Sequence, residues 1–309
     1  MDFKQQLQNF PKQLEWKPQV ENRQNLPKRW SGVLVCGMGG SALPGLLLQS
    51  LLPNKNIITY RDCGLPQNIT KNTFVIAVSY SGNTEETISA YQKAKKQNVP
   101  LALIASGGKL QKLAKKNKDA FVKIPSGIQP RIALGYQFRA LVELVNAPKP
   151  DKIKPNTEKI AREAKKLAKN IGSSIPLFYA STQNKALAYV AKISINENAK
   201  RHSFYNVFPE LNHNELEGYE TFCKNLFIVF LKDKKDDKRI QNRMELTIKL
   251  IEKKGYPVYT FDICGDDWYN RIVCSILFTN WLSYYLAINA SIKPEPVDLI
   301  EEFKDSLRS

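Results

Sequence analysis

Apolar runs of strand length alternate with helix-length segments along this chain, and this alternation constrains its fold more than any other feature. The first series of runs, rich in Val, Ile and Phe, occupies residues 32–36, 56–60, 74–79, 100–105 and 120–124. A second series occupies residues 176–181, 226–231 and 257–263, with a periodic helix predicted over 238–254. Strands that alternate with helices predict a parallel sheet covered by helices. The sequence therefore predicts an α/β fold with two tandem doubly wound parallel-sheet domains.

The segment between the two series has the composition of an interdomain linker. Three prolines fall within residues 146–155, which lack apolar periodicity. A chain of 309 residues is long enough for two domains of about 100 to 200 residues each. We expect an N-terminal domain over residues 1–147, a linker over 148–155 and a C-terminal domain over 156–309.

The formal net charge of +17 raises the question of an anionic partner. Lysine pairs such as Lys95-Lys96 and Lys165-Lys166 lie in predicted amphipathic helices, where a solvated outer face is the ordinary arrangement. The chain has no recognition-helix signature and no basic run interleaved with aromatic residues. We therefore expect an anionic small molecule as partner and no nucleic acid.

The longest apolar stretch, residues 272–290, is interrupted by serine, threonine and asparagine. It predicts a buried helix and no contact with a membrane. Residues 1–10 include Asp2 and three glutamines, where a signal peptide would have basic and then apolar residues. We expect a cytoplasmic protein.

The five cysteines form no Cys-x-x-Cys pair and have no histidine at zinc-ligand spacing. We expect all five to be reduced core residues. Only His202 and His213 are present as imidazole ligands, which excludes a His-rich metal site and leaves a carboxylate site conceivable. A mechanism without a metal is favoured.

The first apolar run leads into a glycine-rich turn. Residues 37–42 read Gly-Met-Gly-Gly-Ser-Ala and precede an apolar helix predicted over 43–52. Glycines in such a turn let backbone N–H groups approach an anion at the positive end of a helix. Gly39, Gly40 and Ser41 are therefore candidate phosphate ligands. The spacing also fits a dinucleotide fingerprint, with Asp62 as the ribose-binding acid, and an ordinary tight turn fits about as well.

A second turn from strand to helix adds three hydroxyl groups. Residues 79–87 read Ser-Tyr-Ser-Gly-Asn-Thr-Glu-Glu-Thr and follow the run at 74–79. Ser79, Ser81 and Thr84 can donate hydrogen bonds to phosphate oxygens, and the helix dipole favours the negative charge. One capping hydroxyl would be ordinary. Three beside a glycine turn favour a phosphate site.

These turns resemble the motifs of the sugar isomerase (SIS) family, whose phosphosugar-binding domains have G-x-G-x-S and S-x-S-G-x-T/S-x-E-T sequences at the ends of parallel strands. Three later segments are similar to its bifunctional phosphoglucose/phosphomannose isomerase branch. They are Asn-Glu-Asn-Ala-Lys at 196–200, Pro-Glu-Leu-Asn-His-Asn-Glu at 209–215 and Pro-Val-Asp-Leu-Ile-Glu-Glu-Phe-Lys at 296–304. The resemblance implies flavodoxin-like SIS domains, a homodimer, and interconversion of glucose 6-phosphate or mannose 6-phosphate with fructose 6-phosphate, without a cofactor.

The resemblance also implies four catalytic residues. Glu197 is implied as the base that moves a proton between C2 and C1, with a pKa raised by its position near a helix end. His213, contributed by the neighbouring subunit, is implied to open the sugar ring with help from Lys304. Arg131 is implied to face the enediolate, where a permanent planar charge suits the task.

Other interpretations of these residues stay open. Glu197 could pair with Arg201, and Lys304 could be a solvated lysine among 46 basic residues. Val297 is apolar near the C-terminal motif, so the preference between glucose and mannose epimers is undetermined. A phosphosugar sensor without catalysis, an isomerase of another phosphosugar and an NAD-dependent enzyme are the alternative functions, although a sensor has no use for Glu197, His213 and Lys304 together.

Overall fold

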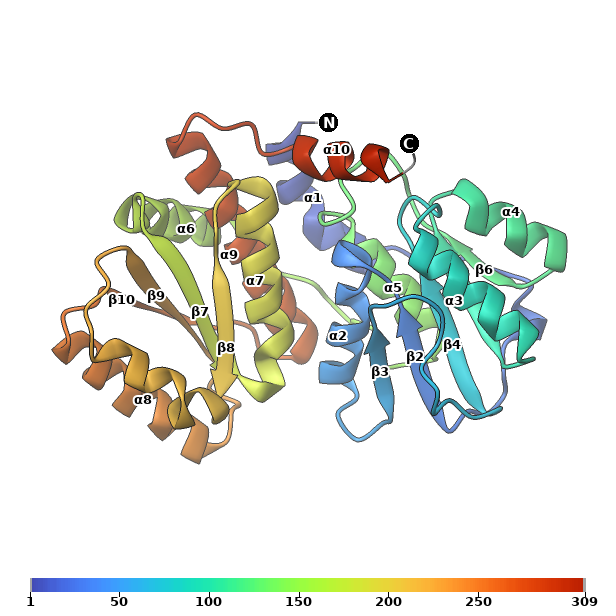
Figure 1. Ribbon diagram of the computed structural model, residues 1–309, viewed down its shortest axis with the longest axis horizontal. Helices are drawn as coiled ribbons and strands as arrows, with labels where there is room; N and C mark the ends of the chain where they lie inside the picture. Colours follow the sequence, from blue (N-terminus) through green and yellow to red (C-terminus); the bar gives the residue numbers. More distant parts are fainter. Residues whose placement is uncertain (1, 308–309) are drawn as a thin grey trace. The chain divides into compact units, whose positions relative to one another are not determined.

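The computed structural model describes residues 2–307, which form two compact units (Figure 1). One unit comprises residues 9–154, and the other comprises residues from Pro155 onward together with the first residues up to Gln8. Phe3 stacks on Tyr284 with ring centroids 6.2 Å apart, so the start of the chain groups with the C-terminal unit. Lys149 pairs with Glu143, with 2.8 Å between Nζ and Oε2, and residues 148–154 group with the N-terminal unit. The contacts thus differ at these two places from the boundaries expected from sequence.

The N-terminal unit is built on a six-stranded sheet with the strand order β1-β6-β5-β4-β2-β3. All neighbouring strands run parallel except β1 and β6. The strands are β1 (Val20–Glu21), β2 (Gly32–Cys36), β3 (Ile57–Tyr60), β4 (Thr73–Val78), β5 (Leu101–Ala105) and β6 (Ala120–Lys123). The helices are α1 (Phe3–Glu15), whose first residues group with the other unit, η1 (Arg23–Asn25), η2 (Gly39–Ser41), α2 (Leu43–Leu51), α3 (Glu85–Lys96), α4 (Gly108–Asn117) and α5 (Leu134–Leu144).

Helices cover both faces of this sheet. On one face, Leu34, Val75 and Leu103 of the central strands pack with Ile88 of α3 and Leu110 of α4 in one buried cluster. Helices α2 and α5 pack on the other face. Because both faces are covered, every residue of β2 and β5 is buried, which explains their unbroken apolar sequences.

The C-terminal unit has a four-stranded, fully parallel sheet in the order β10-β9-β7-β8. The strands are β7 (Ile175–Ser181), β8 (Phe204–Phe208), β9 (Leu226–Lys232) and β10 (Val258–Asp262). The helices are α6 (Thr157–Ile171), η3 (Thr182–Asn184), α7 (Lys185–Asn198), η4 (Glu210–His213), η5 (Glu215–Tyr219), α8 (Lys238–Lys253), α9 (Trp268–Asn289) and α10 (Asp298–Ser306). Met244 and Ile251 of α8 pack on one face of the sheet, and α7 packs on the other.

Helix α9 is the central helix of this unit. Within the described residues it is the one helix long and apolar enough to cross a membrane, yet 78% of its most apolar window is buried inside the protein. Phe278 stacks on Phe261 of β10 with ring centroids 3.8 Å apart, and Trp281 is 2% exposed. The prediction of a buried helix here is confirmed.

The predicted fold class is confirmed, and every predicted strand is present within one or two residues of its expected ends. Strands β1 and β8 were not predicted. β1 has only two residues, and β8 reads Phe-Tyr-Asn-Val-Phe with one fully buried residue, Phe208, so neither has the apolar run of a central strand.

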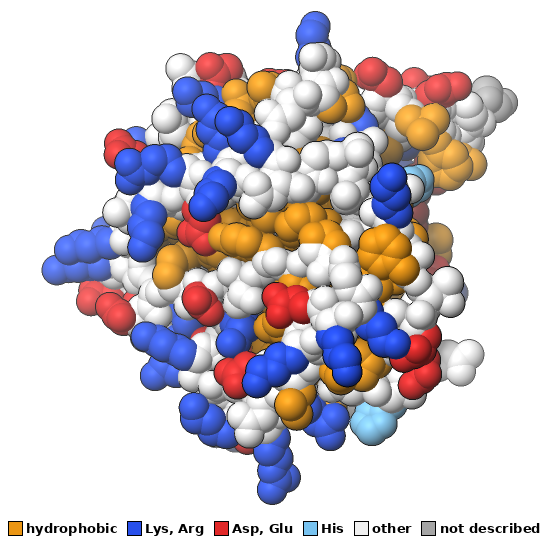
Figure 2. All heavy atoms as spheres, turned by 90° about the vertical axis from the view of Figure 1, so that its left-hand side faces the viewer, with side chains coloured by type: hydrophobic (Ala, Val, Ile, Leu, Met, Phe, Trp, Pro, Cys, Tyr) orange, Lys and Arg blue, Asp and Glu red, His pale blue; other side chains and the backbone are white. Residues whose placement is uncertain are grey.

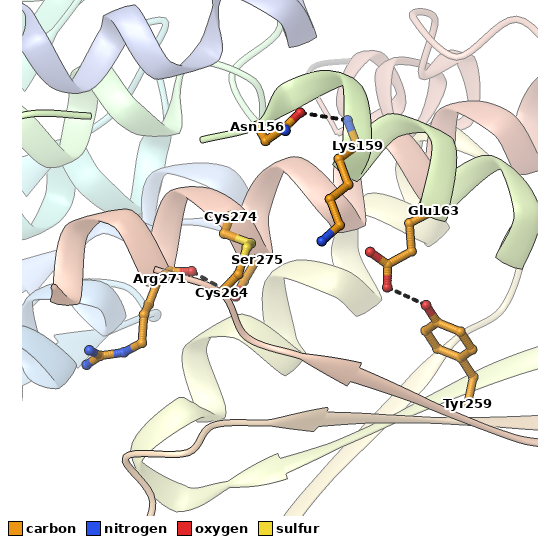
Figure 3. The surroundings of a disulfide bond; sticks show 8 residues. All are labelled: Asn156, Lys159, Glu163, Tyr259, Cys264, Arg271, Cys274 and Ser275. Carbon is orange, nitrogen blue, oxygen red and sulfur yellow. Dashed lines mark hydrogen bonds between the residues drawn. A yellow bond between two sulfur atoms is a disulfide. The ribbon is translucent and has the colours of Figure 1, made fainter. Parts of the chain in front are cut away.

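The expectation for the cysteines is wrong. Cys264, which follows β10, and Cys274 of α9 form a disulfide with Cα atoms 6.0 Å apart (Figure 3). Cys63 and Cys223 are exposed thiols, and Cys36 is the buried thiol. The short connection from β10 into α9 brings together two cysteines that have no recognisable sequence spacing.

Removing this disulfide should lower stability. It closes a loop with a sequence separation of 10 residues, and a loop of that length corresponds to about 2–3 kcal/mol of stabilisation in the chain-entropy description. Without reductant, Cys264→Ser should lower the free energy of unfolding by that amount in urea titrations, whereas in dithiothreitol the variant and the wild type should coincide. Coincidence under both conditions would contradict a formed disulfide.

Candidate functional site

The two predicted phosphate-binding turns begin at adjacent strands. β2 and β4 are neighbours, β3 lies beyond β2, and β5 lies beyond β4. The chain therefore moves outward in opposite directions after β2 and β4. Doubly wound sheets bind ligands at such a switch point, beyond the carboxyl ends of the two strands. We call this position the N-terminal crevice. Cys36 at the end of β2 pairs with Ala77 near the end of β4, so both turns start at the same level.

The glycine turn fits closely against its surroundings. A Cβ atom on Gly37 would lie 2.6 Å from the carbonyl oxygen of Ser41 and 2.9 Å from that of Val78. A Cβ atom on Gly40 would lie 3.2 Å from both Cα and N of Arg131. The backbone of Arg131 thus lies against the turn. Ser41 Oγ accepts a hydrogen bond of 3.0 Å from Tyr80 N–H, which joins the two turns.

The second predicted turn, residues 79–87, is called the hydroxyl turn, and hydrogen bonds of its own side chains organise it. Ser79 Oγ lies 2.8 Å from Thr84 Oγ1 and accepts a 3.1 Å hydrogen bond from Gly82 N–H. Ser81 Oγ accepts a 3.2 Å bond from Asn83 N–H. Thr84 is the N-cap of α3, yet its side chain accepts no hydrogen bond from that helix. The first turn of α3 therefore has N–H groups without this cap, which can stabilise an anion.

Arg131 belongs to the segment whose backbone lies against the glycine turn. Its side chain is buried, and Nη1 donates to Gln129 Oε1 at 3.2 Å. Gln137 and Gln13 hold the surrounding loop, since each donates a side-chain hydrogen bond to a backbone carbonyl, of Pro130 at 3.0 Å and of Ile132 at 2.9 Å. These two hydrogen bonds thus fix the backbone on both sides of Arg131.

The C-terminal sheet has a corresponding crevice with a different charge. β7 and β9 are neighbours, and β8 and β10 lie beyond them. Asp236 accepts from Ser181 Oγ at 2.6 Å, and Asp233 pairs with Arg271, with 3.2 Å between Oδ2 and Nε. Burial raises the pKa of Asp236 to about 6, with a further rise from the charge of Asp233. Two carboxylates at this crevice disfavour phosphate, so the N-terminal crevice is the better anion site.

The remaining predicted residues belong to the C-terminal unit. Glu197 lies in the last turn of α7, is half-buried, and its carbonyl oxygen accepts from Lys200 Nζ at 2.5 Å. His213 ends η4 and is exposed. Lys304 lies on α10, with Nζ 2.6 Å from Glu301 Oε1. Arg201, the alternative partner of Glu197, donates to the carbonyl oxygens of Gly172 and Ser174 at 2.7 and 2.8 Å.

The structure therefore brings the six predicted substrate ligands and Arg131 to one crevice of the N-terminal unit. They are Gly39, Gly40, Ser41, Ser79, Ser81 and Thr84. Glu197, His213 and Lys304 lie in the other unit, and their assembly with the crevice stays a prediction.

Two further residues, Ser106 and Tyr80, lie beside the crevice and were not predicted as functional from the sequence. Ser106 Oγ donates to the carbonyl oxygen of Tyr80 at 2.7 Å, and Tyr80 OH accepts from Ile128 N–H at 3.1 Å. Burial raises the pKa of Tyr80, which keeps this hydroxyl neutral. Ser106 follows a strand and precedes two glycines, so the pattern that identified the other two turns could have found it.

Basic side chains do not gather on the face that Figure 2 shows. Lysine and arginine side chains are spread over it and interrupted by acidic ones, with an apolar band across the middle. On this face the arrangement agrees with the sequence-based interpretation of scattered, solvated lysines.

Comparison with known proteins first defines the class. The model of the SIS domain matches residues 64–136, and that of the bacterial phospho-glucose isomerase C-terminal SIS domain matches residues 160–307. The C-terminal domain of glucosamine-fructose-6-phosphate aminotransferase from Francisella tularensis has the same fold, with a TM-score of 0.70, 14% identity, and coverage of 95% of this chain and 98% of that one. The chain is a protein with two SIS domains.

Sequence relatives then define the family. A bifunctional phosphoglucose/phosphomannose isomerase from Caldicellulosiruptor bescii is 37% identical over 89% of this chain and 89% of that protein. A D-glucosamine-6-phosphate 4-epimerase from Sulfolobus acidocaldarius is 32% identical over 87% of each. The chain belongs to the bifunctional phosphoglucose/phosphomannose isomerase family.

The close contact between the hydroxyl turn and the next loop predicts that Gly82 cannot be replaced by a larger residue without loss of stability. A Cβ atom on Gly82, at φ +73°, would lie 2.0 Å from the carbonyl oxygen of Gly107, whereas Gly127, at φ +87°, has nothing within 4 Å. Both alanine variants should lose roughly 1–3 kcal/mol through backbone strain. Gly82→Ala should lose a further ~1–3 kcal/mol through overlap. Urea unfolding measures both losses, and equal losses would contradict the close contact.

Proposed function

We propose that this chain is an aldose–ketose isomerase that interconverts glucose 6-phosphate and fructose 6-phosphate through an enediolate, with mannose 6-phosphate as a second substrate. Membership of the isomerase family supports this most strongly, because the matched C-terminal range 160–307 contains Glu197, His213 and Lys304. The N-terminal crevice supplies the phosphate site, since it offers neutral hydroxyls, an uncapped helix start and a buried arginine.

The proposed reaction begins with ring opening and continues with proton transfer. His213 takes the proton of the anomeric hydroxyl at C1 and delivers it to the ring oxygen, with Lys304 assisting. Glu197 then removes the C2 proton of the open-chain aldose and delivers it to C1, while a proton moves from O2 to O1. Arg131 stabilises the enediolate charge between these transfers. These reaction steps need no cofactor.

The cellular setting is part of the same proposal. The enzyme acts on a phosphosugar of glycolysis and gluconeogenesis in the cytoplasm, with no nucleic acid or membrane partner. The Cys264–Cys274 disulfide is compatible with this compartment in a hyperthermophile, where intracellular disulfides are common.

Product analysis separates the proposed function from its alternatives. Purified protein in EDTA is given glucose 6-phosphate, mannose 6-phosphate or glucosamine 6-phosphate, and the products are identified by NMR. Fructose 6-phosphate from the first substrate supports the isomerase. A C4 epimer from the third would instead support the activity of the Sulfolobus relative, and saturable binding without any product would support a sensor.

Glu197→Gln should abolish most of the isomerase activity. The amide keeps the shape of the side chain but cannot accept the C2 proton, and loss of a general base typically lowers the rate by ~10² to 10⁴-fold. The measurement is kcat for glucose 6-phosphate, with circular dichroism to check folding. Glu252→Gln, an exposed glutamate in the last turn of α8, is the matched control and should be fully active. A folded Glu197→Gln enzyme with near-normal kcat would place the base elsewhere.

We further propose a homodimer in which His213 enters the site of the neighbouring subunit. His213 is exposed in its own chain, as a residue that serves another subunit needs to be. Glu197→Gln and His213→Ala homodimers are then both nearly inactive, while a mixed dimer has one site with both lesions and one intact site.

Mixing the two inactive proteins should therefore restore activity. With free subunit exchange, about half the dimers are mixed and each has one intact site, so recovery should reach roughly a quarter of the wild-type activity. Mass-tagged subunits confirm the exchange. Exchange without recovery would place His213 in the same chain as its site.

A further inference from the structure

His213 lies in a short segment that is anchored on both sides. The segment consists of η4, Asn214 and η5. Leu211 before His213 is 0% exposed, and Tyr219 at the end of η5 is 5% exposed. Both belong to the buried cluster that contains Tyr179 and Phe208. The chain around the exposed histidine is thus fixed to the core of its unit.

Glu215, two residues after His213, makes two hydrogen bonds to the strands of its unit. Its Oε1 accepts a 2.6 Å hydrogen bond from Tyr179 OH, and its Oε2 accepts a short hydrogen bond from Asn206 Nδ2. Tyr179 OH lies 2.5 Å from Tyr219 OH. Tyr179 of β7 and Asn206 of β8 therefore bind the carboxylate, and Tyr219 of η5 joins the network through its hydrogen bond with Tyr179.

The network is suited to hold a position and not to transfer protons. Both oxygens of the Glu215 carboxylate are used by partners within the fold. Burial raises the pKa of Tyr179 far above its ordinary value, with further increases from its neighbours Tyr219 and Glu215. Tyr179 therefore stays protonated and remains a donor at every working pH.

A second contact fixes the other flank of the histidine. Asn212 Nδ2 donates to Thr247 Oγ1 of α8 at 2.8 Å, and Thr247 is 2% exposed. Asn212 Oδ1 also lies 3.4 Å from Arg243 Nη1. His213 and Asn214, both exposed, thus lie between the side chains of Asn212 and Glu215, which are bonded to different elements.

We propose that Glu215 is a positioning residue, which fixes the backbone that presents His213 through its hydrogen bonds to Tyr179 and Asn206. This inference rests on the proposed function, in which His213 opens the sugar ring. Misplacement of a catalytic group by about 1 Å can lower a rate ~10²-fold, so the network controls kcat. Phosphate binding, which the N-terminal crevice provides, is left unchanged.

Glu215→Ala should therefore lower kcat for glucose 6-phosphate by ~10²-fold with KM changed less than about threefold. Glu215→Gln should keep most of the activity, because its carbonyl can accept from Asn206 and its NH2 group can donate to Tyr179 while Tyr179 donates to Tyr219. Tyr179→Phe should lower kcat by about tenfold, since it removes one of the two hydrogen bonds to the carboxylate.

The matched control is Tyr259→Phe, which breaks a partly buried tyrosine–glutamate hydrogen bond of 2.5 Å to Glu163 in the same unit (Figure 3). Tyr259 lies on β10, at the opposite edge of the sheet from β8. Its loss should resemble Tyr179→Phe in thermal stability and leave kcat unchanged.

A double-mutant test separates positioning from general destabilisation. In a His213→Ala background, Glu215→Ala and Tyr179→Phe should not lower the residual kcat further, because their effect passes through the histidine. Additive losses, or an equal loss in Tyr259→Phe, would overturn the proposal, and an inactive Glu215→Gln would make Glu215 itself an acid or base. If Glu215→Ala does not fold, Tyr179→Phe and Glu215→Gln decide the question alone.

An inactive wild-type enzyme would refute the proposed function instead, whereas an active wild type with an unaffected Glu215→Ala would refute only this inference.

Discussion

The parallel pairing of β2 with β4 is the constraint on which the proposed phosphate site depends. It sets Cys36 opposite Ala77, so the turns that follow the two strands leave the sheet at one level and can share a ligand. Ser41 can then accept from Tyr80 N–H, and Gly40 can lie against the backbone of Arg131. Neither contact depends on a long-range charge. Strand pairing and these close contacts bring the hydroxyls, the amides and the backbone of Arg131 together. The short distances explain why glycines occupy the positions of closest approach.

The two units share one architecture and differ in the charge of their crevices. In the N-terminal unit the turns after the strands provide hydroxyls and amides, and the buried Arg131 lies in the loop whose backbone contacts Gly40. In the C-terminal unit the equivalent strand ends provide Asp233 and Asp236, with Arg271 paired to the first. An anion is therefore favoured in one crevice and disfavoured in the other. Under the proposed function this divides the work, because the N-terminal unit holds the phosphate while the C-terminal unit supplies the groups that move protons.

Much of the fold could be predicted because buried parallel strands have unbroken apolar sequences. The predicted runs 32–36 and 100–105 contain β2 and β5, which are buried at every residue, and the predicted phosphate turns follow β2 and the largely buried β4. β8 could not be found in this way, since it lies at the sheet edge and is mostly half-exposed. The disulfide and the hydrogen bonds of Glu215 could also not be predicted from the sequence. Cys264 and Cys274 meet because β10 lies against α9, and Tyr179, Asn206 and Glu215 meet because β7 pairs with β8. Such contacts between distant residues leave no local pattern in a single sequence.

The central claim is that the chain moves a proton between C2 and C1 of a hexose 6-phosphate through an enediolate. The most direct test is to let the purified enzyme equilibrate glucose 6-phosphate with fructose 6-phosphate in D2O and to examine both sugars by NMR. A carboxylate base exchanges its proton with solvent between the two transfers, so deuterium should accumulate at C1 of fructose 6-phosphate and at C2 of glucose 6-phosphate. Sugars that interconvert over many turnovers and remain free of deuterium would show direct hydride transfer, and that result would contradict the account.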